Sequence, residues 1–204
     1  MAENIEQLYT QSQITERVKE MGAEICADFI PSKPLLAICV IKGAVLFYAD
    51  LVKAIRDRDV RFGFVAASSY YSATGDRMLS TGTVNMKYSS VDDSEIVGAD
   101  VLIVEDIIDT GRTLKALKEY FYEKGANMVK IATLLNKPDC RVVDIEPDYC
   151  GFSFYNNPYI IGYGLDNAQQ YCRLLLAFYS GRSLFPVWNG RRRTRQLRAG
   201  REKR

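Results

Sequence analysis

The stretch VLIVEDIIDTGRTL, residues 101 to 114, predicts a strand that runs through a polar turn into a helix. It opens as an apolar run, reaches two adjacent acids at Glu105 and Asp106, and adds a third acid at Asp109. A turn with one glycine follows, Thr110 to Thr113, after which helical periodicity resumes. We therefore expect a strand over 100–105 and a helix over about 112–124.

Strands and helices alternate along the rest of the chain. Short unbroken apolar runs, typical of strands covered on both faces, alternate with segments whose apolar residues recur every three or four positions. This order predicts an α/β fold, a twisted and mainly parallel sheet flanked by helices on both faces. The polar stretch 70–82 predicts a loop. The further helices expected are 13–29 and 44–57, and the further strands are 34–41, 60–69, 83–88 and 128–135.

Composition limits the chemistry that the chain can perform. Its 204 residues, 48% hydrophobic and 25% charged, suit one globular domain with one well-buried core. The absence of histidine excludes Ser-His and Cys-His nucleophiles and every His-ligated metal site. Five cysteines, none in C-x-x-C spacing, predict neither a disulfide framework nor a zinc site. Acid–base work must fall to carboxylates, lysine or tyrosine, and a bound metal would be a hard cation such as magnesium.

Charge is distributed unevenly along the chain. Residues 191–204 hold eight Arg or Lys and one Glu, so the other residues carry 19 basic against 24 acidic side chains. Such a run is usually a solvated end, and the alternative is an electrostatic contact with RNA or another polyanion. No apolar run approaches the roughly 18 residues of a membrane span. Because the N-terminus also lacks the basic and apolar regions of a signal peptide, we expect a cytoplasmic protein with no membrane partner.

The turn that follows the expected strand 100–105 is suited to binding an anion. A helix N-terminus offers unpaired backbone N–H groups and a positive dipole end, which favour phosphate. Gly111 allows close approach of the backbone, and Thr110 and Thr113 add hydroxyl donors. Glu105 and Asp106 would repel that phosphate, so they must face hydroxyl groups or a cation. Phosphoribosyl pyrophosphate combines a monophosphate, vicinal hydroxyls and a magnesium-bound pyrophosphate, and it meets all three demands.

Five motifs in order resemble the type I phosphoribosyltransferases, the hypoxanthine-guanine branch in particular. VEDIIDTGRTL (104–114) is similar to the phosphoribosyl-pyrophosphate loop of that family and CVIKGAVLF (39–47) to its pyrophosphate loop. SSY and STG (68–70 and 80–82) resemble its mobile flap, and LLNK and PYIIGYGLD (134–137 and 158–166) its purine pocket. The resemblance covers about residues 10–173. It implies the type I fold with a small purine-binding hood, in a single domain over 1–180 followed by a divergent basic extension over 181–204.

The resemblance implies roles for the sugar-phosphate side of the site. Glu105 and Asp106 would hold the ribose hydroxyls, directly or through magnesium, and the loop would wrap the 5-phosphate. Asp109 would be the general base at purine N7, while the alternative is that it caps the helix. The peptide between Ile41 and Lys42 would be cis at least when pyrophosphate is bound. The residues expected to bind phosphoribosyl pyrophosphate are Lys42, Gly43, Ser69, Tyr70, Glu105, Asp106, Asp109, Thr110, Gly111, Arg112, Thr113 and Arg173.

The resemblance also implies a purine side. Lys137 would donate to the 6-oxo group, unless it is an ordinary solvated lysine. Tyr159 would stack on the base, unless this aromatic residue belongs to the core, and Ile160 would meet the base edge through its backbone. Asp166 would end the purine pocket and coordinate a second magnesium ion. Arg173 lies seven residues after Asp166 rather than six, which puts its pyrophosphate role and the family's final short strand in doubt.

Two functions are compatible with these motifs. The resemblance implies a purine salvage enzyme that uses Mg²⁺, phosphoribosyl pyrophosphate and a 6-oxopurine, releases pyrophosphate, and forms a homodimer or homotetramer. The alternative is a regulator on the same fold that senses phosphoribosyl pyrophosphate or a nucleotide and binds RNA through the basic end. A purine pocket favours the enzyme, so we expect no nucleic-acid partner, and acceptance of xanthine stays open.

Overall fold

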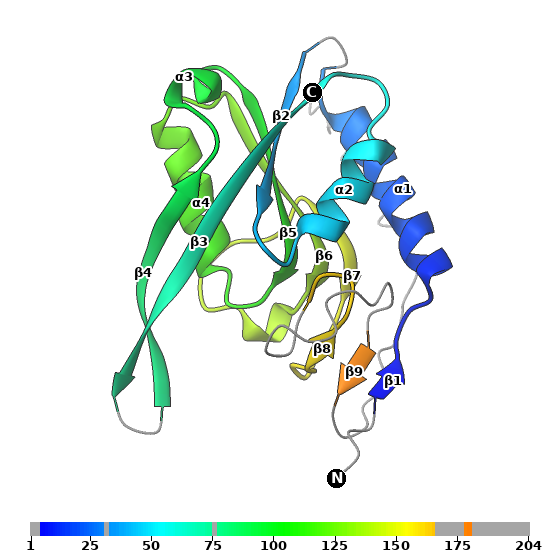
Figure 1. Ribbon diagram of the computed structural model, residues 1–204, viewed down its shortest axis with the longest axis vertical. Helices are drawn as coiled ribbons and strands as arrows, with labels where there is room; N and C mark the ends of the chain where they lie inside the picture. Colours follow the sequence, from blue (N-terminus) through cyan, green and yellow to red (C-terminus); the bar gives the residue numbers. More distant parts are fainter. Residues whose placement is uncertain (1–4, 31–32, 75–76, 166–177, 181–204) are drawn as a thin grey trace, which may run out of the picture.

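A six-stranded sheet of order β4-β3-β2-β5-β6-β7 forms the centre of the protein (Figure 1). The computed structural model describes residues 5–30, 33–74, 77–165 and 178–180. The elements are β1 (Ile5–Gln7), α1 (Gln11–Asp28), β2 (Leu35–Val40), α2 (Val45–Ala54), β3 (Val60–Thr74), β4 (Arg77–Ser89), α3 (Asp93–Ile96), β5 (Asp100–Ile108), α4 (Arg112–Glu123), β6 (Met128–Asn136), a 3₁₀ helix (Pro138–Cys140), β7 (Tyr149–Ser153), β8 (Ile160–Ile161) and β9 (Phe178–Ser180).

The sheet is mainly parallel, as expected from the sequence, and it separates two apolar cores. Strands β3, β2, β5, β6 and β7 pair in parallel, and β4 is antiparallel to β3. Residues of β2 alternate between the two faces, with Ala37 in one core and Ile38 in the other. Helices α1 and α2 cover the first face and α4 the opposite one (Figure 1), with Phe47 and Phe121 fully buried beneath them.

The central strand β5 is longer than the apolar run predicted. Its pairing with β6 continues from Glu105 opposite Thr133 to Ile108 opposite Asn136, so the two adjacent acids lie within the strand. The expected end at residue 105 was therefore wrong. Backbone pairing with β6 does not depend on the polarity of the side chains, which explains why the change from apolar to acidic residues did not mark the boundary.

Residues 70–74 and 77–82 of the polar stretch form strands rather than the loop that the composition predicted. Strands β3 and β4 pair from Val65 opposite Ser89 to Thr74 opposite Arg77, with register irregularities at Ala66/Ala67 and Ser69/Tyr71. Figure 1 shows this two-stranded arm extending beyond the rest of the sheet. Tyr, Thr and Val favour strands, and each strand satisfies the backbone groups of the other. The segment is therefore part of a hairpin arm formed by β3 and β4. The side chains of residues 68–86 in this arm are not described.

A second, smaller sheet joins both ends of the described chain. It has the order β1-β9-β8, with antiparallel pairs between Ile5 and Ser180 and between Ile161 and Phe178. A last strand is thus present despite the divergent sequence after Arg173. None of the helices in the described part of the chain is long and apolar enough to cross a membrane.

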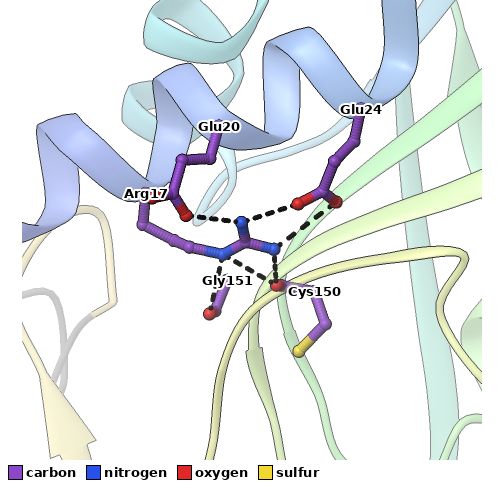
Figure 2. A network of polar contacts seen from close by, with 5 residues as sticks. All are labelled: Arg17, Glu20, Glu24, Cys150 and Gly151. Atoms are coloured by element: carbon purple, nitrogen blue, oxygen red, sulfur yellow. Dashed lines mark hydrogen bonds and ion pairs between the residues drawn. The ribbon is translucent and has the colours of Figure 1, made fainter. Parts of the chain in front are cut away.

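Arg17 of α1 holds the helix against β7, one edge strand of the large sheet (Figure 2). Its guanidinium donates to the carbonyl oxygen of Cys150 at 2.7 and 3.2 Å and to that of Gly151 at 3.2 Å. It also pairs with Glu20 at 2.9 Å and with Glu24 at 2.8 Å. Because an edge strand has carbonyls without a partner strand, this arginine stabilises the edge as well as the helix position.

Candidate active site

A cavity of about 270 Å³ opens at the carboxyl ends of β2 and β5, beside the start of α4. This is the edge where ligands bind in parallel α/β sheets. The cavity brings together many of the residues expected from the sequence, including Lys42, Gly43, Glu105, Asp106, Asp109, Thr110, Gly111 and Thr113.

The turn from Asp109 to Gly111, which we call the phosphate loop, exposes backbone donors. Gly111 occupies the N-cap position of α4 with φ +81°, and no side chain caps the helix there. Gly111, and not Asp109, is therefore the N-cap residue of α4. Among the described residues, the amides of Thr110 and Gly111 have no hydrogen-bond partner. The loop thus presents two N–H groups at a helix N-terminus, an arrangement that suits an anion.

Glu105 and Asp106 crowd negative charge into one side of the cavity. Asp106 is 8% exposed and accepts a hydrogen bond from the Ile107 amide at 2.7 Å, while Glu105 accepts one from the Asp106 amide at 3.3 Å. Burial, and then the charge of Asp106, raise the pKa of Glu105 well above its usual range. Burial and the same two carboxylates also raise the pKa of the buried Cys39 thiol to about 12. A bound cation or sugar hydroxyls would relieve this repulsion.

These carboxylates suit magnesium, although they form only part of a coordination shell. Mg²⁺ prefers oxygen ligands and is usually held by one or two carboxylates together with water and substrate phosphates. Within the described part of the chain, no group of three or more His, Cys, Asp or Glu could hold a metal ion. Two adjacent acids beside a loop that suits an anion would fit a cation that arrives with a phosphorylated substrate.

Close backbone packing joins the expected pyrophosphate loop to its neighbours. The peptide between Ile41 and Lys42 is cis, which confirms that prediction. A Cβ atom added to Gly43 would lie 1.8 Å from Oδ2 of Asp106, and one added to Gly164 would lie 2.1 Å from the Gly43 carbonyl oxygen. Gly164 belongs to the turn that precedes Asp166, so the segment 158–165, which was expected to bind the purine, packs directly on the loop that carries Lys42.

The purine-side residues are described as far as Leu165. Lys137 is 8% exposed, and its ammonium donates to Oδ1 of Asn157 at 2.9 Å, so the interpretation as a solvated lysine was wrong. Tyr159 is 47% exposed, which excludes a place in the core, whereas Ile160 is buried in β8. The buried ammonium of Lys137 and the exposed ring of Tyr159 thus lie in segments that contact each other through Asn157.

Several expected residues cannot be placed in the site by their side chains. Arg112 is the first residue of α4. Ser69 and Tyr70 lie in β3, where the side chains are not described. Asp166 and Arg173 lie outside the described residues.

Two neighbours of Asp109 carried no signal in the sequence. Arg141 donates hydrogen bonds to the backbone carbonyl of Asp109 and to the side chain of Asn136. Burial and a hydrogen bond to the Asp109 carboxylate raise the pKa of the Cys140 thiol. Both residues follow Lys137 in a segment without periodicity, so only the folded chain brings them to the phosphate loop.

Comparisons with known proteins agree with this geometry. Residues 4–167 match the family model described as phosphoribosyl transferase domain. The hypoxanthine-guanine phosphoribosyltransferase of Streptococcus pneumoniae is 44% identical over 167 residues, which cover 82% of this chain and 88% of that protein. A solved hypoxanthine phosphoribosyltransferase from Staphylococcus aureus has a TM-score of 0.77 and 36% identity, covering 86% of this chain and 91% of that one. The Trypanosoma cruzi enzyme, studied for the role of its C-terminal region in oligomeric state and activity, has a TM-score of 0.77, 34% identity and the same coverage.

Proposed function

Because this chain belongs to the phosphoribosyl transferase family, we propose that it is a purine salvage enzyme that transfers the 5-phosphoribosyl group of phosphoribosyl pyrophosphate to hypoxanthine or guanine. The products are IMP or GMP and pyrophosphate. The observation that carries the proposal is one cavity lined by Lys42, by Glu105 and Asp106, and by the phosphate loop. These groups match the charges of the activated sugar from its 5-phosphate to its pyrophosphate.

The phosphorylated sugar lies across the cavity. The amides of Thr110 and Gly111 and the hydroxyl of Thr113 bind the 5-phosphate, with Arg112 at the same helix start. Glu105 and Asp106 hold the ribose hydroxyls. Pyrophosphate is bound by Lys42 and Gly43 and, as the resemblance implies, by Ser69, Tyr70 and Arg173.

Magnesium is the proposed cofactor, held by Glu105 and Asp106 and, for a second ion, by Asp166. When bound, it neutralises charge on the pyrophosphate leaving group. The protein's own task is to fix these oxygen ligands beside the ribose.

The base lies between Asp109 and the purine segment. Asp109 accepts the proton of purine N7 as the glycosidic bond forms, which is the role of a general base. Lys137 donates to the 6-oxo group, Tyr159 stacks on the ring, and the backbone of Ile160 meets its edge. The hairpin arm formed by β3 and β4 is the proposed lid, because water must be kept from the oxocarbenium-like ribose.

Lys137→Ala is expected to raise KM for hypoxanthine and guanine about 10- to 100-fold, and KM for phosphoribosyl pyrophosphate by less than about threefold. A hydrogen bond from a charged group contributes about 1.5 to 3 kcal/mol, which corresponds to that range. Steady-state kinetics with each substrate varied in turn measure both constants.

Lys130→Ala provides the matched control. Lys130 lies in β6, the strand that ends just before Lys137, but it pairs with Asp28 at 2.8 Å and does not line the cavity. We expect this variant to leave both KM values near those of the unmodified protein. If Lys137→Ala raised KM equally for the purine base and for phosphoribosyl pyrophosphate, Lys137 would not be the residue that recognises the base.

The remaining expectations concern the whole chain. We propose a single domain over 1–180, a basic extension over 181–204, self-association as a dimer or tetramer, and a cytoplasmic location. The buried ammonium of Lys137 and the exposed ring of Tyr159 favour the enzyme over an RNA-binding sensor, since a sensor of the sugar alone needs no purine pocket. If the protein still bound RNA after deletion of residues 191–204, that result would favour the RNA-binding sensor over the enzyme.

A further inference from the structure

The phosphate loop is anchored from one side by the residues that follow the 3₁₀ helix. Arg141 donates to the carbonyl oxygen of Asp109, and the amide of Val142 donates to the carbonyl oxygen of Thr110 at 3.1 Å. Two consecutive carbonyls of the loop are therefore bound by two consecutive residues of another segment.

This pairing determines where the loop's amides point. In a planar trans peptide the C=O and the following N–H point in opposite directions. With the carbonyls of Asp109 and Thr110 directed at the segment that begins with Arg141, the amides of Thr110 and Gly111 must point away from it. Both residues line the cavity, and neither amide has a hydrogen-bond partner among the described residues. The anchor thus leaves two adjacent donors for a ligand.

The loop also lies directly against the same segment. A Cβ atom on Gly111 would lie 2.6 Å from Cγ2 of Ile145, 2.9 Å from Cδ of Arg141 and 3.2 Å from Cγ2 of Val143. The loop therefore has no space to settle closer to this support, and the two hydrogen bonds hold it from moving away.

The Arg141 side chain is oriented to bind the loop, although this orientation leaves one of its own nitrogens without a hydrogen bond. The side chain is 9% exposed, and its Nε has no hydrogen-bond partner within the described residues, with Glu146 at 3.7 Å as its nearest ion-pair partner. Its two terminal nitrogens donate to Asp109 and Asn136. A buried donor left without a hydrogen bond is unfavourable, so the contacts made by the other two nitrogens fix this orientation.

We propose that Arg141 is a positioning residue that holds the phosphate loop in its ligand-binding conformation, an inference that rests on the proposed function for the identity of the ligand. It touches no reacting atom. Its effect is to present the Thr110 and Gly111 amides to the 5-phosphate and to keep Asp109 at a fixed distance from that phosphate.

The test compares Arg141→Met with Arg17→Met in the full chain. Both changes remove a guanidinium that donates to backbone carbonyls, but Arg17 binds Cys150 and Gly151 away from the cavity (Figure 2). Calorimetry with ribose 5-phosphate measures binding of the sugar and its 5-phosphate without the pyrophosphate, and kinetics give kcat and KM for phosphoribosyl pyrophosphate. We expect Arg141→Met to weaken the binding of ribose 5-phosphate and to raise the KM for phosphoribosyl pyrophosphate, each about 10- to 100-fold. Arg17→Met should lower the unfolding temperature and leave both of these quantities unchanged. Guanidinium at non-denaturing concentrations should partly restore Arg141→Ala.

Val142→Pro tests the same anchor without emptying a buried site. Val142 is 56% exposed, and Arg141 before it has φ −66° and ψ 128°, which is compatible with a following proline. The change removes the N–H that binds Thr110, and we expect ribose 5-phosphate to bind about 3- to 10-fold more weakly. This variant decides the question if the Arg141 variants do not fold.

The outcomes separate this inference from the proposed function. Unchanged ribose 5-phosphate affinity in Arg141→Met, or in Val142→Pro when Arg141→Met does not fold, would overturn it and leave Arg141 a purely structural residue. An unmodified protein that does not bind ribose 5-phosphate would overturn it as well. An unmodified protein that binds ribose 5-phosphate but transfers no phosphoribosyl group would refute the proposed function alone, and the binding measurements would still test the anchor.

Discussion

Asp109→Asn is expected to lower kcat about 100-fold or more, while phosphoribosyl pyrophosphate binds nearly as tightly as before. Asparagine keeps the size and much of the hydrogen bonding of the side chain but cannot accept the purine proton, and general acid–base catalysis typically contributes 100- to 10,000-fold. The loop's backbone contacts to Arg141 and Val142 do not involve the carboxylate. Rapid-quench or steady-state rates, together with calorimetric binding of the activated sugar, measure the two effects separately.

Asp148→Asn is the control for this change. The Asp148 carboxylate accepts a hydrogen bond from the Ile131 amide at 2.8 Å, and Asp148 does not line the cavity. Its replacement should leave kcat within about twofold. Unchanged turnover in Asp109→Asn would make Asp109 a phosphate-loop residue with no role in proton transfer.

Gly43→Ala is expected to reduce kcat/KM for phosphoribosyl pyrophosphate by about 100-fold. The added methyl group would lie 1.8 Å from Oδ2 of Asp106, a short side chain that is 8% exposed and hydrogen-bonded to the Ile107 amide. The carboxylate must therefore leave its position beside the proposed ribose and magnesium site, or the loop with Lys42 must retreat. A hundredfold effect corresponds to about 2.7 kcal/mol, the strength of one or two hydrogen bonds to charged groups.

Gly98→Ala is the matched control for Gly43→Ala. A Cβ atom there meets nothing within 4 Å, although its φ of +71° makes alanine strained. This variant should lose some stability and keep its kcat/KM, as measured by thermal unfolding and initial rates. If Gly43→Ala had normal kcat/KM and a normal magnesium requirement, Asp106 would not be a ligand-binding carboxylate.

Local patterns in the sequence were sufficient for the centre of the fold. The unbroken apolar runs became β2, β5 and β6, and the periodic segment after Gly111 became α4. Residues of the phosphate loop could be found as well, because helix N-termini and glycine turns are encoded by adjacent residues.

Features that depend on distant partners were missed or misjudged. The arm formed by β3 and β4 carries a polar sequence that predicts a loop, and only pairing between its strands makes it regular. Strand β7 has no long apolar run, and Arg17 from the far end of the chain helps to hold it. Lys137 is buried through its contact with Asn157, and Arg141 acts on a loop some thirty residues earlier. Such contacts have no local pattern from which they could be predicted.

The central claim is tested most directly by a spectrophotometric assay of the full chain with phosphoribosyl pyrophosphate and Mg²⁺, run separately with hypoxanthine, guanine, xanthine, adenine and uracil. Our account predicts turnover of hypoxanthine and guanine that is lost with EDTA and restored by added Mg²⁺, and the relative rate with xanthine shows whether it is a substrate. If the protein bound phosphoribosyl pyrophosphate but converted neither hypoxanthine nor guanine, this result would contradict the account.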